Sequence, residues 1–282
     1  DATTVDNGAA IAAATGAGTV NFSAGGVSDV YAKIITSTAL TANMQAVDAK
    51  DADVNVAITD TVVVDANAVT ALNTLRDDTN GTTGQVTATI NGTAAALATL
   101  DAASASDSAL TITVNDVATA AEGAAIVAAT DSATVDFSAA GVSDSFGNLT
   151  TTTAVSTAMQ AIDAKDADVN IVVNAAVTTA SANNVTALNA LMSATTGNVT
   201  ATVSGDGAEL DGLQANSGNN QVLTITVDDA MTGSAGVTSL NAIAASTSGT
   251  VTAAAVSGNS ADLASLTASG TSATQAYTIT VD

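Results

Sequence analysis

The sequence is a tandem duplication. Residues 44–55 (MQAVDAKDADVN) return as residues 159–170 (MQAIDAKDADVN), at an offset of 115 residues. The same offset relates TVNFSAGGVSD at 19–29 to TVDFSAAGVSD at 134–144. A duplication of this length constrains the fold strongly, because each copy is expected to form the same elements and to pack on its neighbours in the same way.

A shorter repeat lies inside the duplication. Its three copies open with VTALNTL, VTALNAL and VTSLNAI, and each closes with TITV. We call the longer segments A repeats and the shorter segments B repeats. The predicted organisation is a first repeat at 1–116 (A, 1–68; B, 69–116), a second at 117–229 (A, 117–184; B, 185–229) and a third, partial repeat at 230–282 that contains a B repeat only.

Two hydrophobic periods alternate along each repeat. TITV, VTATI and VNVAI alternate apolar and polar side chains and are β-branched, which predicts strands. LNTL, LATL, LDGL and LASL place apolar residues three apart in Ala-rich surroundings, which predicts helices of two or three turns. Strand and helix in alternation predict an α/β solenoid of parallel strands with short helices, and a pure parallel β-solenoid is the alternative.

The ends of the sequence look alike. Residues 2–5 lie in a segment that resembles the closing TITVDDA of a B repeat, and residues 277–281 end the last B repeat. We therefore expect the chain to begin and end on strands of one ladder. The chain contains no Pro, which is consistent with continuous ladders in which every strand donates its N–H groups. Free edge strands at the ends predict head-to-tail self-association.

Composition excludes several functions. The chain has no His and no Cys, so Ser-His-Asp and Cys-His nucleophile systems cannot be built, and we predict that it is not an enzyme and has no catalytic or cofactor-binding residues. With four basic and 27 acidic side chains the net charge is -23, which argues against binding nucleic acid. No apolar stretch is long enough to span a bilayer, so no membrane insertion is expected.

The acidic residues supply the one candidate metal site. Aspartates at alternate positions recur in both A repeats, where a predicted helix ends and a strand begins, and oxygen ligands in that arrangement suit Ca²⁺. The alternative is a solvated turn in which Lys50 or Lys165 pairs with a neighbouring Asp. Asp116, Asp228 and Asp229 are predicted to N-cap the helix that follows each of them. The candidate Ca²⁺ ligands are Asp51, Asp53, Asp166 and Asp168.

Units such as VTALNAL, VTATV and LTITVDD resemble the Ala/Thr/Asp-rich, Pro- and Cys-free repeat regions of large secreted bacterial cell-surface proteins, including cyanobacterial-type S-layer and giant adhesin-like proteins. That resemblance implies an extracellular, cell-surface location, assembly with copies of itself and often Ca²⁺ dependence. The chain lacks the glycine-rich nonapeptides of many Ca²⁺-binding members. We predict a structural protein of a surface filament, layer or stalk. An adhesin or phage-type fibre module that binds a surface ligand, with a cell-surface polysaccharide as candidate partner, is the alternative.

Overall fold

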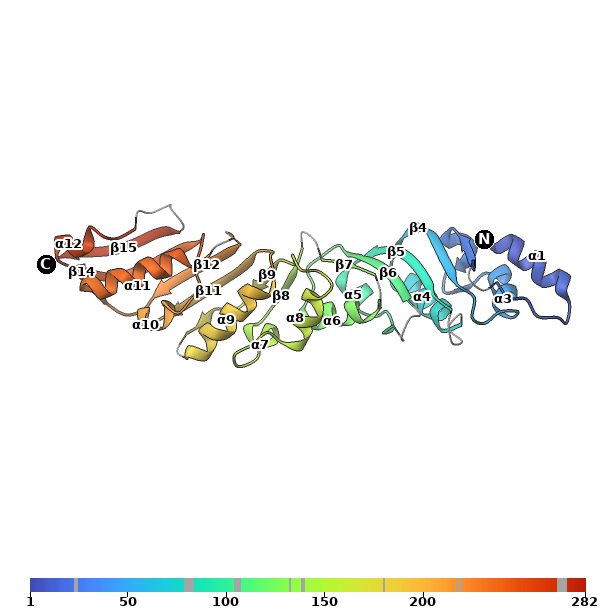
Figure 1. Cartoon of the computed structure of the whole chain (residues 1–282), viewed down its shortest axis with the longest axis horizontal. Coiled ribbons are helices and arrows are strands. Elements are labelled where there is room, and N and C mark those ends of the chain that lie inside the picture. The colour runs from blue at the N-terminus through green and yellow to red at the C-terminus, as the bar shows by residue number, and fades with distance from the viewer. Residues whose placement is uncertain are drawn as a thin grey trace. The chain divides into compact units, whose positions relative to one another are not determined.

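The fold is that of a computed structural model, which describes residues 1–22, 25–78, 84–103, 108–131, 133–137, 140–179, 181–216, 218, 220–267 and 273–282. The chain divides into two compact units, Asp1–Ala140 and Gly141–Asp282, which we call unit 1 and unit 2 and describe separately (Figure 1). The division falls within the second predicted A repeat, so residues 117–140 belong to the unit that holds the first repeat.

Unit 1 is built on a parallel sheet whose strands neighbour one another in chain order, β1-β4-β5-β6-β7. Thr3 extends the sheet by a single parallel bridge to Val27. A small antiparallel pair, β2 with β3, stands apart from the sheet. The strands are β1 (Val27–Asp29), β2 (Ile35–Thr36), β3 (Ala39–Leu40), β4 (Val56–Val64), β5 (Val86–Gly92), β6 (Ser108–Val114) and β7 (Val135–Asp136).

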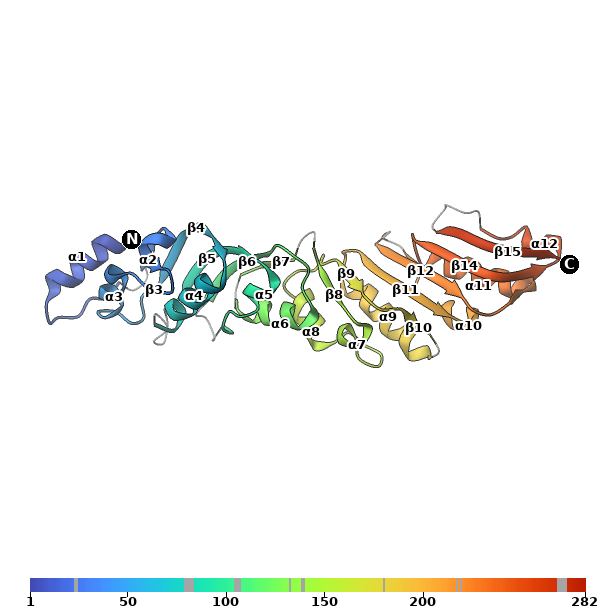
Figure 2. The ribbon, with the colours of Figure 1, turned by 180° about the vertical axis from the view of Figure 1, so that it is seen from behind.

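Unit 2 also has a parallel sheet whose main strands neighbour one another in chain order. Its long strands lie side by side in both views of the ribbon (Figures 1 and 2). The main strands pair in the order β8, β9, β11, β12, β14 and β15. The short β10 and β13 pair with the C-terminal halves of β11 and β14. The strands are β8 (Val142–Asp144), β9 (Ile171–Val173), β10 (Val177–Thr178), β11 (Val199–Gly205), β12 (Gln221–Val227), β13 (Met231–Thr232), β14 (Thr250–Gly258) and β15 (Thr274–Val281).

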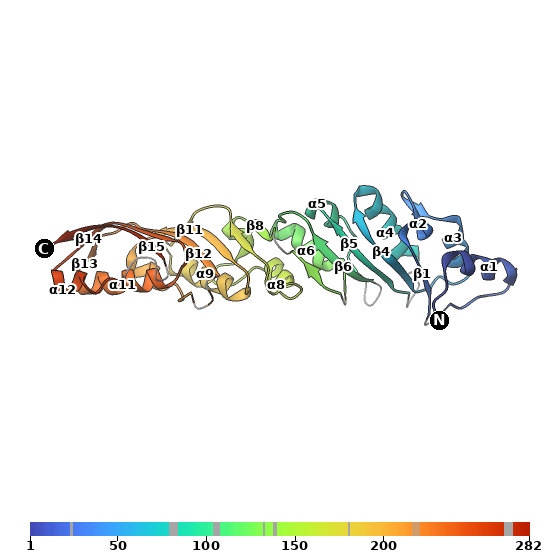
Figure 3. The ribbon, with the colours of Figure 1, turned by 90° about the horizontal axis from the view of Figure 1, so that it is seen from above.

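Helices connect the strands and, in unit 2, lie on one side of the sheet, below β12, β14 and β15 in the view of Figure 3. Threonine hydroxyls cap many of them; Thr4, Thr41, Thr93 and Thr119 each accept a first-turn N–H. The helices are α1 (Val5–Thr15), α2 (Tyr31–Ile34), α3 (Ala42–Asp48), α4 (Ala66–Asp78), α5 (Ala94–Leu97), α6 (Ala120–Ala128), α7 (Phe146–Leu149), α8 (Thr157–Asp163), α9 (Ala182–Ala194), α10 (Gly207–Leu210), α11 (Gly233–Ala245) and α12 (Ser260–Leu263).

Side chains alternate between the two faces of each sheet. Val62, Ile90, Ile112 and Val135 are paired across four neighbouring strands, and all are buried under the helices. The opposite face carries exposed threonines in register, among them Thr61, Thr89 and Thr111. Thr suits that face because it is β-branched and its hydroxyl meets water. The core therefore lies between one face of the sheet and the helices.

The predicted α/β class with parallel strands is confirmed, and the pure β alternative is wrong because helices stand between most of the strands. The prediction of two- or three-turn helices at LATL, LDGL and LASL is wrong: α5, α10 and α12 are single turns of four residues, and each ends at the first Leu of its segment. No helix among the described residues is long and apolar enough to cross a membrane.

The predicted strand at residues 2–5 is wrong except for the single bridge of Thr3. Val5 begins α1, and Thr4 caps that helix by accepting the N–H of Asn7 at 3.3 Å. In the 115-residue register, Thr4 corresponds to Thr119, the N-cap of α6. Residues 2–5 thus form the connection into α1 and not a ladder strand.

Candidate functional site

Aspartate carboxylates cap the helices that precede them in the chain. Asp116 accepts the backbone N–H of Ala94, the first residue of α5, at 2.6 Å, and Asp229 accepts that of Gly207, the first residue of α10, at 2.7 Å. Asp29 binds Val5 of α1 in the same way, at 3.1 Å. A negative charge beside a helix N-terminus is stabilising. The prediction that Asp116 and Asp229 cap the following helix is therefore wrong in direction.

The direction follows from the parallel topology. A strand that runs parallel to its predecessor ends at the edge of the sheet from which the preceding helix departs. Its terminal Asp consequently faces the N-terminus of that earlier helix, whereas the following helices have Thr119 and Thr232 as their N-caps. The Asp residues tie neighbouring segments of the chain together, 22 to 24 residues apart for the three pairs above.

An asparagine in each B repeat holds the next loop by both backbone groups. The Asn189 amide donates to the Gly212 carbonyl oxygen at 2.8 Å, and its Oδ1 accepts the N–H of Gln214 at 2.9 Å. The loop that is bound follows directly on the one-turn helix α10. The same two bonds are made by Asn73 to Thr99 and Asp101, and by Asn241 to Ser265 and Thr267.

We call Asn73, Asn189 and Asn241 the asparagine clamps. The sequence interpretation missed them, because a polar residue in an amphipathic helix is usually part of its solvated face. The signal that could have found them is their identity in all three copies of VTxLN, in which an amide side chain is kept next to the invariant Leu.

The predicted Ca²⁺ ligands fall in both units, Asp51 and Asp53 in unit 1 and Asp166 and Asp168 in unit 2. Asp51 accepts the backbone N–H of Phe22 at 2.6 Å, so one of its oxygens anchors the N-terminal loop. Asp166 is buried, while its neighbour Asp168 is exposed and Asp53 is half-buried. The described part of the chain holds no group of three or more carboxylates, imidazoles or thiols placed to share a metal ion. Ca²⁺ binding stays a prediction.

Lys50 binds backbone carbonyl groups, whereas the solvated-turn alternative pairs it with a neighbouring Asp. Lys50 Nζ donates to the backbone carbonyls of Gly16 and Gly18, the latter at 3.1 Å. It thereby holds the end of α1, whose C-cap is Gly16, against the turn after α3. Together with Asp51, it fixes the N-terminal loop of unit 1 from two sides.

A shallow depression in unit 2 gathers carboxylates. It is lined by Asp206, Glu209 and Asp228 with the hydroxyl-bearing Thr178 and Ser204. These groups accept and donate hydrogen bonds to water or to hydroxylated ligands. The depression contains no aromatic ring, imidazole or amine among its lining residues.

Asp6 on α1 forms an ion pair with Lys33, with 2.9 Å between Asp6 Oδ2 and Lys33 Nζ. The hydrogen bond from Lys33, and then that from Asn43, lowers the pKa of Asp6. The pair stabilises the folded state above the unfolded-state pKa of the carboxyl group, and this contribution is lost as the pH falls through the lowered folded-state value. We expect Lys33→Met to raise the pKa of Asp6, measured by NMR titration of its carboxyl carbon. Unchanged titration in the variant would contradict this assignment.

The last strand exposes side chains that its neighbours bury. β15 pairs with β14. Its inward residues are Tyr277, Ile279 and Val281, which lie beside Ala253, Val256 and Gly258 of β14. Ile279 is 47% exposed and Val281 is 66% exposed. The Tyr277 hydroxyl is buried without a hydrogen-bond partner among the described residues, and burial raises its pKa to about 12.

The turn after β14 continues this exposed surface. Leu263 of α12 and Leu266 just beyond it are half-buried, although the matching leucines of α5 and α10 are buried. We define the C-terminal face as Leu263, Leu266, Tyr277, Ile279 and Val281. Such an apolar surface, beside a strand edge that is unpaired among the described residues, is the candidate docking site for another chain.

No family model matches the sequence, and no curated protein and no solved structure is significantly similar to it. The two features that stand out in the geometry are the asparagine clamps between neighbouring segments and the apolar C-terminal face of unit 2.

Proposed function

We propose that the chain is a non-enzymatic, extracellular structural protein that builds a surface filament, layer or stalk from copies of itself. The observation that carries the proposal is the C-terminal face: Ile279 and Val281 stand exposed on a strand whose outer edge is unpaired among the described residues. A soluble chain with a net charge of -23 tolerates such a surface until a partner covers it.

A solenoid supports the same role. Strands in chain order, joined from one segment to the next by aspartate caps and asparagine clamps, are the arrangement expected of an α/β solenoid that follows the A and B repeats. In such a fold each segment contacts only its neighbours, and an end that lacks a neighbour remains adhesive. In an assembly, one copy then stacks on the next in the way that neighbouring segments stack within one chain.

Sedimentation velocity over a wide concentration range, with and without Ca²⁺, tests the proposal. We expect oligomers that grow with concentration and that appear as filaments or a lattice by negative-stain electron microscopy. Deleting residues 277–282 removes the exposed half of β15 and should shift the distribution to monomers. A chain that stays monomeric at high concentration under both conditions would rule out self-assembly.

An adhesin or phage-type fibre module that binds a cell-surface polysaccharide is a second candidate. The depression with Asp206, Glu209, Thr178 and Ser204 favours it, since carboxylates and hydroxyls recognise sugar hydroxyl groups. Electron microscopy separates the two candidates: continuous filaments or a lattice support the structural role, and isolated tips support the adhesin.

A further inference from the structure

The C-terminal face of unit 2 has a buried counterpart inside unit 1. YTITV at 277–281 corresponds to LTITV at 110–114, and LASL at 263–266 corresponds to LATL at 97–100. The counterparts are between 0% and 5% exposed, because α6 packs on α5 and β7 pairs with β6. In order, the counterparts of Leu263, Leu266, Tyr277, Ile279 and Val281 are Leu97, Leu100, Leu110, Ile112 and Val114.

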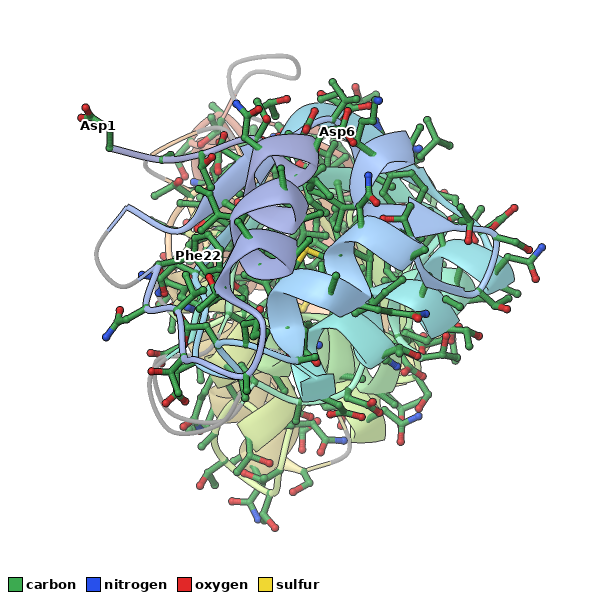
Figure 4. The ribbon with its side chains drawn as sticks, turned by 90° about the vertical axis from the view of Figure 1, so that its right-hand side faces the viewer. Asp1, Asp6 and Phe22 are labelled. Atoms are coloured by element: carbon green, nitrogen blue, oxygen red, sulfur yellow. The ribbon has the colours of Figure 1, made fainter. Side chains whose placement is uncertain are left out.

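The segment that covers this counterpart also recurs, at the start of the chain. Residues 120–137 supply α6, β7 and Phe137, and residues 5–22 are their first copy at the 115-residue offset. Ile126 is fully buried, whereas its equivalent Ile11 is 46% exposed. Val135 and Phe137 are buried, whereas Val20 and Phe22 are half-buried. Figure 4 shows Phe22 beside α1 on this end of unit 1, with the Asp1 side chain standing clear of the ribbon.

The joint inside unit 1 has a defined register. Ile112 pairs with Val135 and Thr113 with Asp136, and the Ile112 N–H donates to the Thr134 carbonyl oxygen at 3.0 Å. Asp116 closes the joint by accepting the N–H of Ala94. The equivalent of Asp116 at the start of the chain is Asp1.

We propose that residues 1–22 of a second copy dock on the C-terminal face and reproduce the joint of β6, β7, α5 and α6. This inference rests on the proposed self-assembly and names its contact. In the joint, Ile279 pairs with Val20 and Thr280 with Asn21 of the second copy. Ile11 covers Leu263 and Leu266, and the Asp1 carboxylate accepts the backbone N–H of Ser260, the counterpart of Ala94.

The sequence across the joint is continuous with that inside the chain. YTITVD at 277–282 followed by DATT at 1–4 matches LTITVDDAMT at 223–232. A second copy is therefore the occupant whose side chains already fit: both halves of the surface expose the residues that bury each other where the two halves meet within unit 1. The contact is heterologous, so it generates an open chain of copies unless its rotation closes a ring.

A register-specific cross-link tests the joint directly. The chain has no Cys, so Asn21→Cys with Thr280→Cys introduces the only two thiols. Paired residues on neighbouring strands lie roughly 4.8 Å apart, within the Cα separation of a disulfide. We expect a ladder of covalent oligomers on oxidation. Asn21→Cys with Thr278→Cys is the matched control, because Thr278 lies on the same face but two residues out of register, and it should give no ladder.

Two charge variants test the apolar contact. Ile11→Asp and Ile279→Asp each place a carboxylate in the joint, and each should weaken association at least tenfold in sedimentation experiments. Both residues are already about half exposed, so folding is expected to survive. Val63→Asp is the control: Val63 is 73% exposed on the outward face of β4 and should leave association unchanged.

Mixing the variants gives the decisive result. Ile11→Asp keeps an intact C-terminal face, and Ile279→Asp keeps an intact start, so an equimolar mixture should form dimers and stop there. Suppose that the wild-type chain assembles, that both charge variants assemble equally well, and that Asn21→Cys with Thr280→Cys forms no ladder. The joint is then wrong, while the structural role stands. If the wild-type chain stays monomeric, the structural role fails as well.

Discussion

Replacing Gly141 by Ala should destabilise unit 2 by about 2 to 5 kcal/mol, combining a left-handed backbone with overpacking. Gly141 has φ +67°, which L residues rarely adopt. An added Cβ would lie 2.2 Å from the carbonyl oxygen of Asn170, and that oxygen accepts the N–H of Val142 at 2.8 Å. The methyl group would therefore push β8 away from β9. Urea unfolding of the full chain, followed by circular dichroism, measures the loss.

Replacing two other glycines of unit 2 distinguishes the cost of a positive φ from the cost of a close contact with the added Cβ. Gly233 also has a positive φ, +60°, but an added Cβ meets nothing within 4 Å, so Gly233→Ala should cost only about 1–2 kcal/mol. Gly147 in α7 has neither problem, and Ala there should be neutral or stabilise by up to about 1 kcal/mol. Equal losses for Gly141→Ala and Gly233→Ala would show that the close approach to Asn170 is not the cause.

Removing all three asparagine clamps should destabilise the chain by about 3–9 kcal/mol, because each loses two hydrogen bonds at a net cost of about 1–3 kcal/mol and the sites share no partners. Asn189→Ala alone leaves the Gly212 carbonyl and the Gln214 N–H without their bonds at 2.8 and 2.9 Å. The loop after α10 then loses its anchor. Urea unfolding of the single and triple variants gives the losses.

Asn183→Ala is the matched control for the single variant, because Asn183 lies exposed in the first turn of the same helix, α9. Its replacement should change the free energy of unfolding by less than about 0.5 kcal/mol. Asn189→Asp keeps the acceptor for Gln214 and loses the donor to Gly212, so its loss should equal or exceed half that of Asn189→Ala. A loss no larger than that of Asn183→Ala would mean that the clamps carry no stability.

The alternation of strand and helix was predictable from hydrophobic period alone, because residues that repeat every two or every three to four positions decide which face is buried. Gly26 and Gly141 could also have been singled out. The first position of the Gly25-Gly26 pair becomes Ala140 in the second copy, while the second position stays Gly. At the position that stays Gly, the carbonyl oxygen of Asn55 or Asn170 comes too close for a Cβ.

The partners of the polar side chains could not be predicted in the same way. An Asp at a strand end has two helices within reach, and only the three-dimensional path of parallel strands selects the earlier one. The clamp Asn73 reaches residues 99 and 101, a distance along the chain that no local pattern encodes. Exposure at the C-terminal face could not be predicted either, because YTITV at 277–281 has the same pattern as LTITV at 110–114, which is buried.

The clamps also have a consequence for how the chain folds. The clamps join residues 23 to 28 positions apart, from Asn189 with Gly212 to Asn73 with Asp101. The hydrogen bond from the Gln85 N–H to Asn55 spans 30 positions. Separations of this size are short compared with the 282 residues of the chain, so each of these contacts closes only a small loop. Each strand can therefore add to the edge of the one before it as soon as some 30 further residues are available. Folding is expected to advance along the chain during synthesis, with little need for distant parts of the sequence to meet.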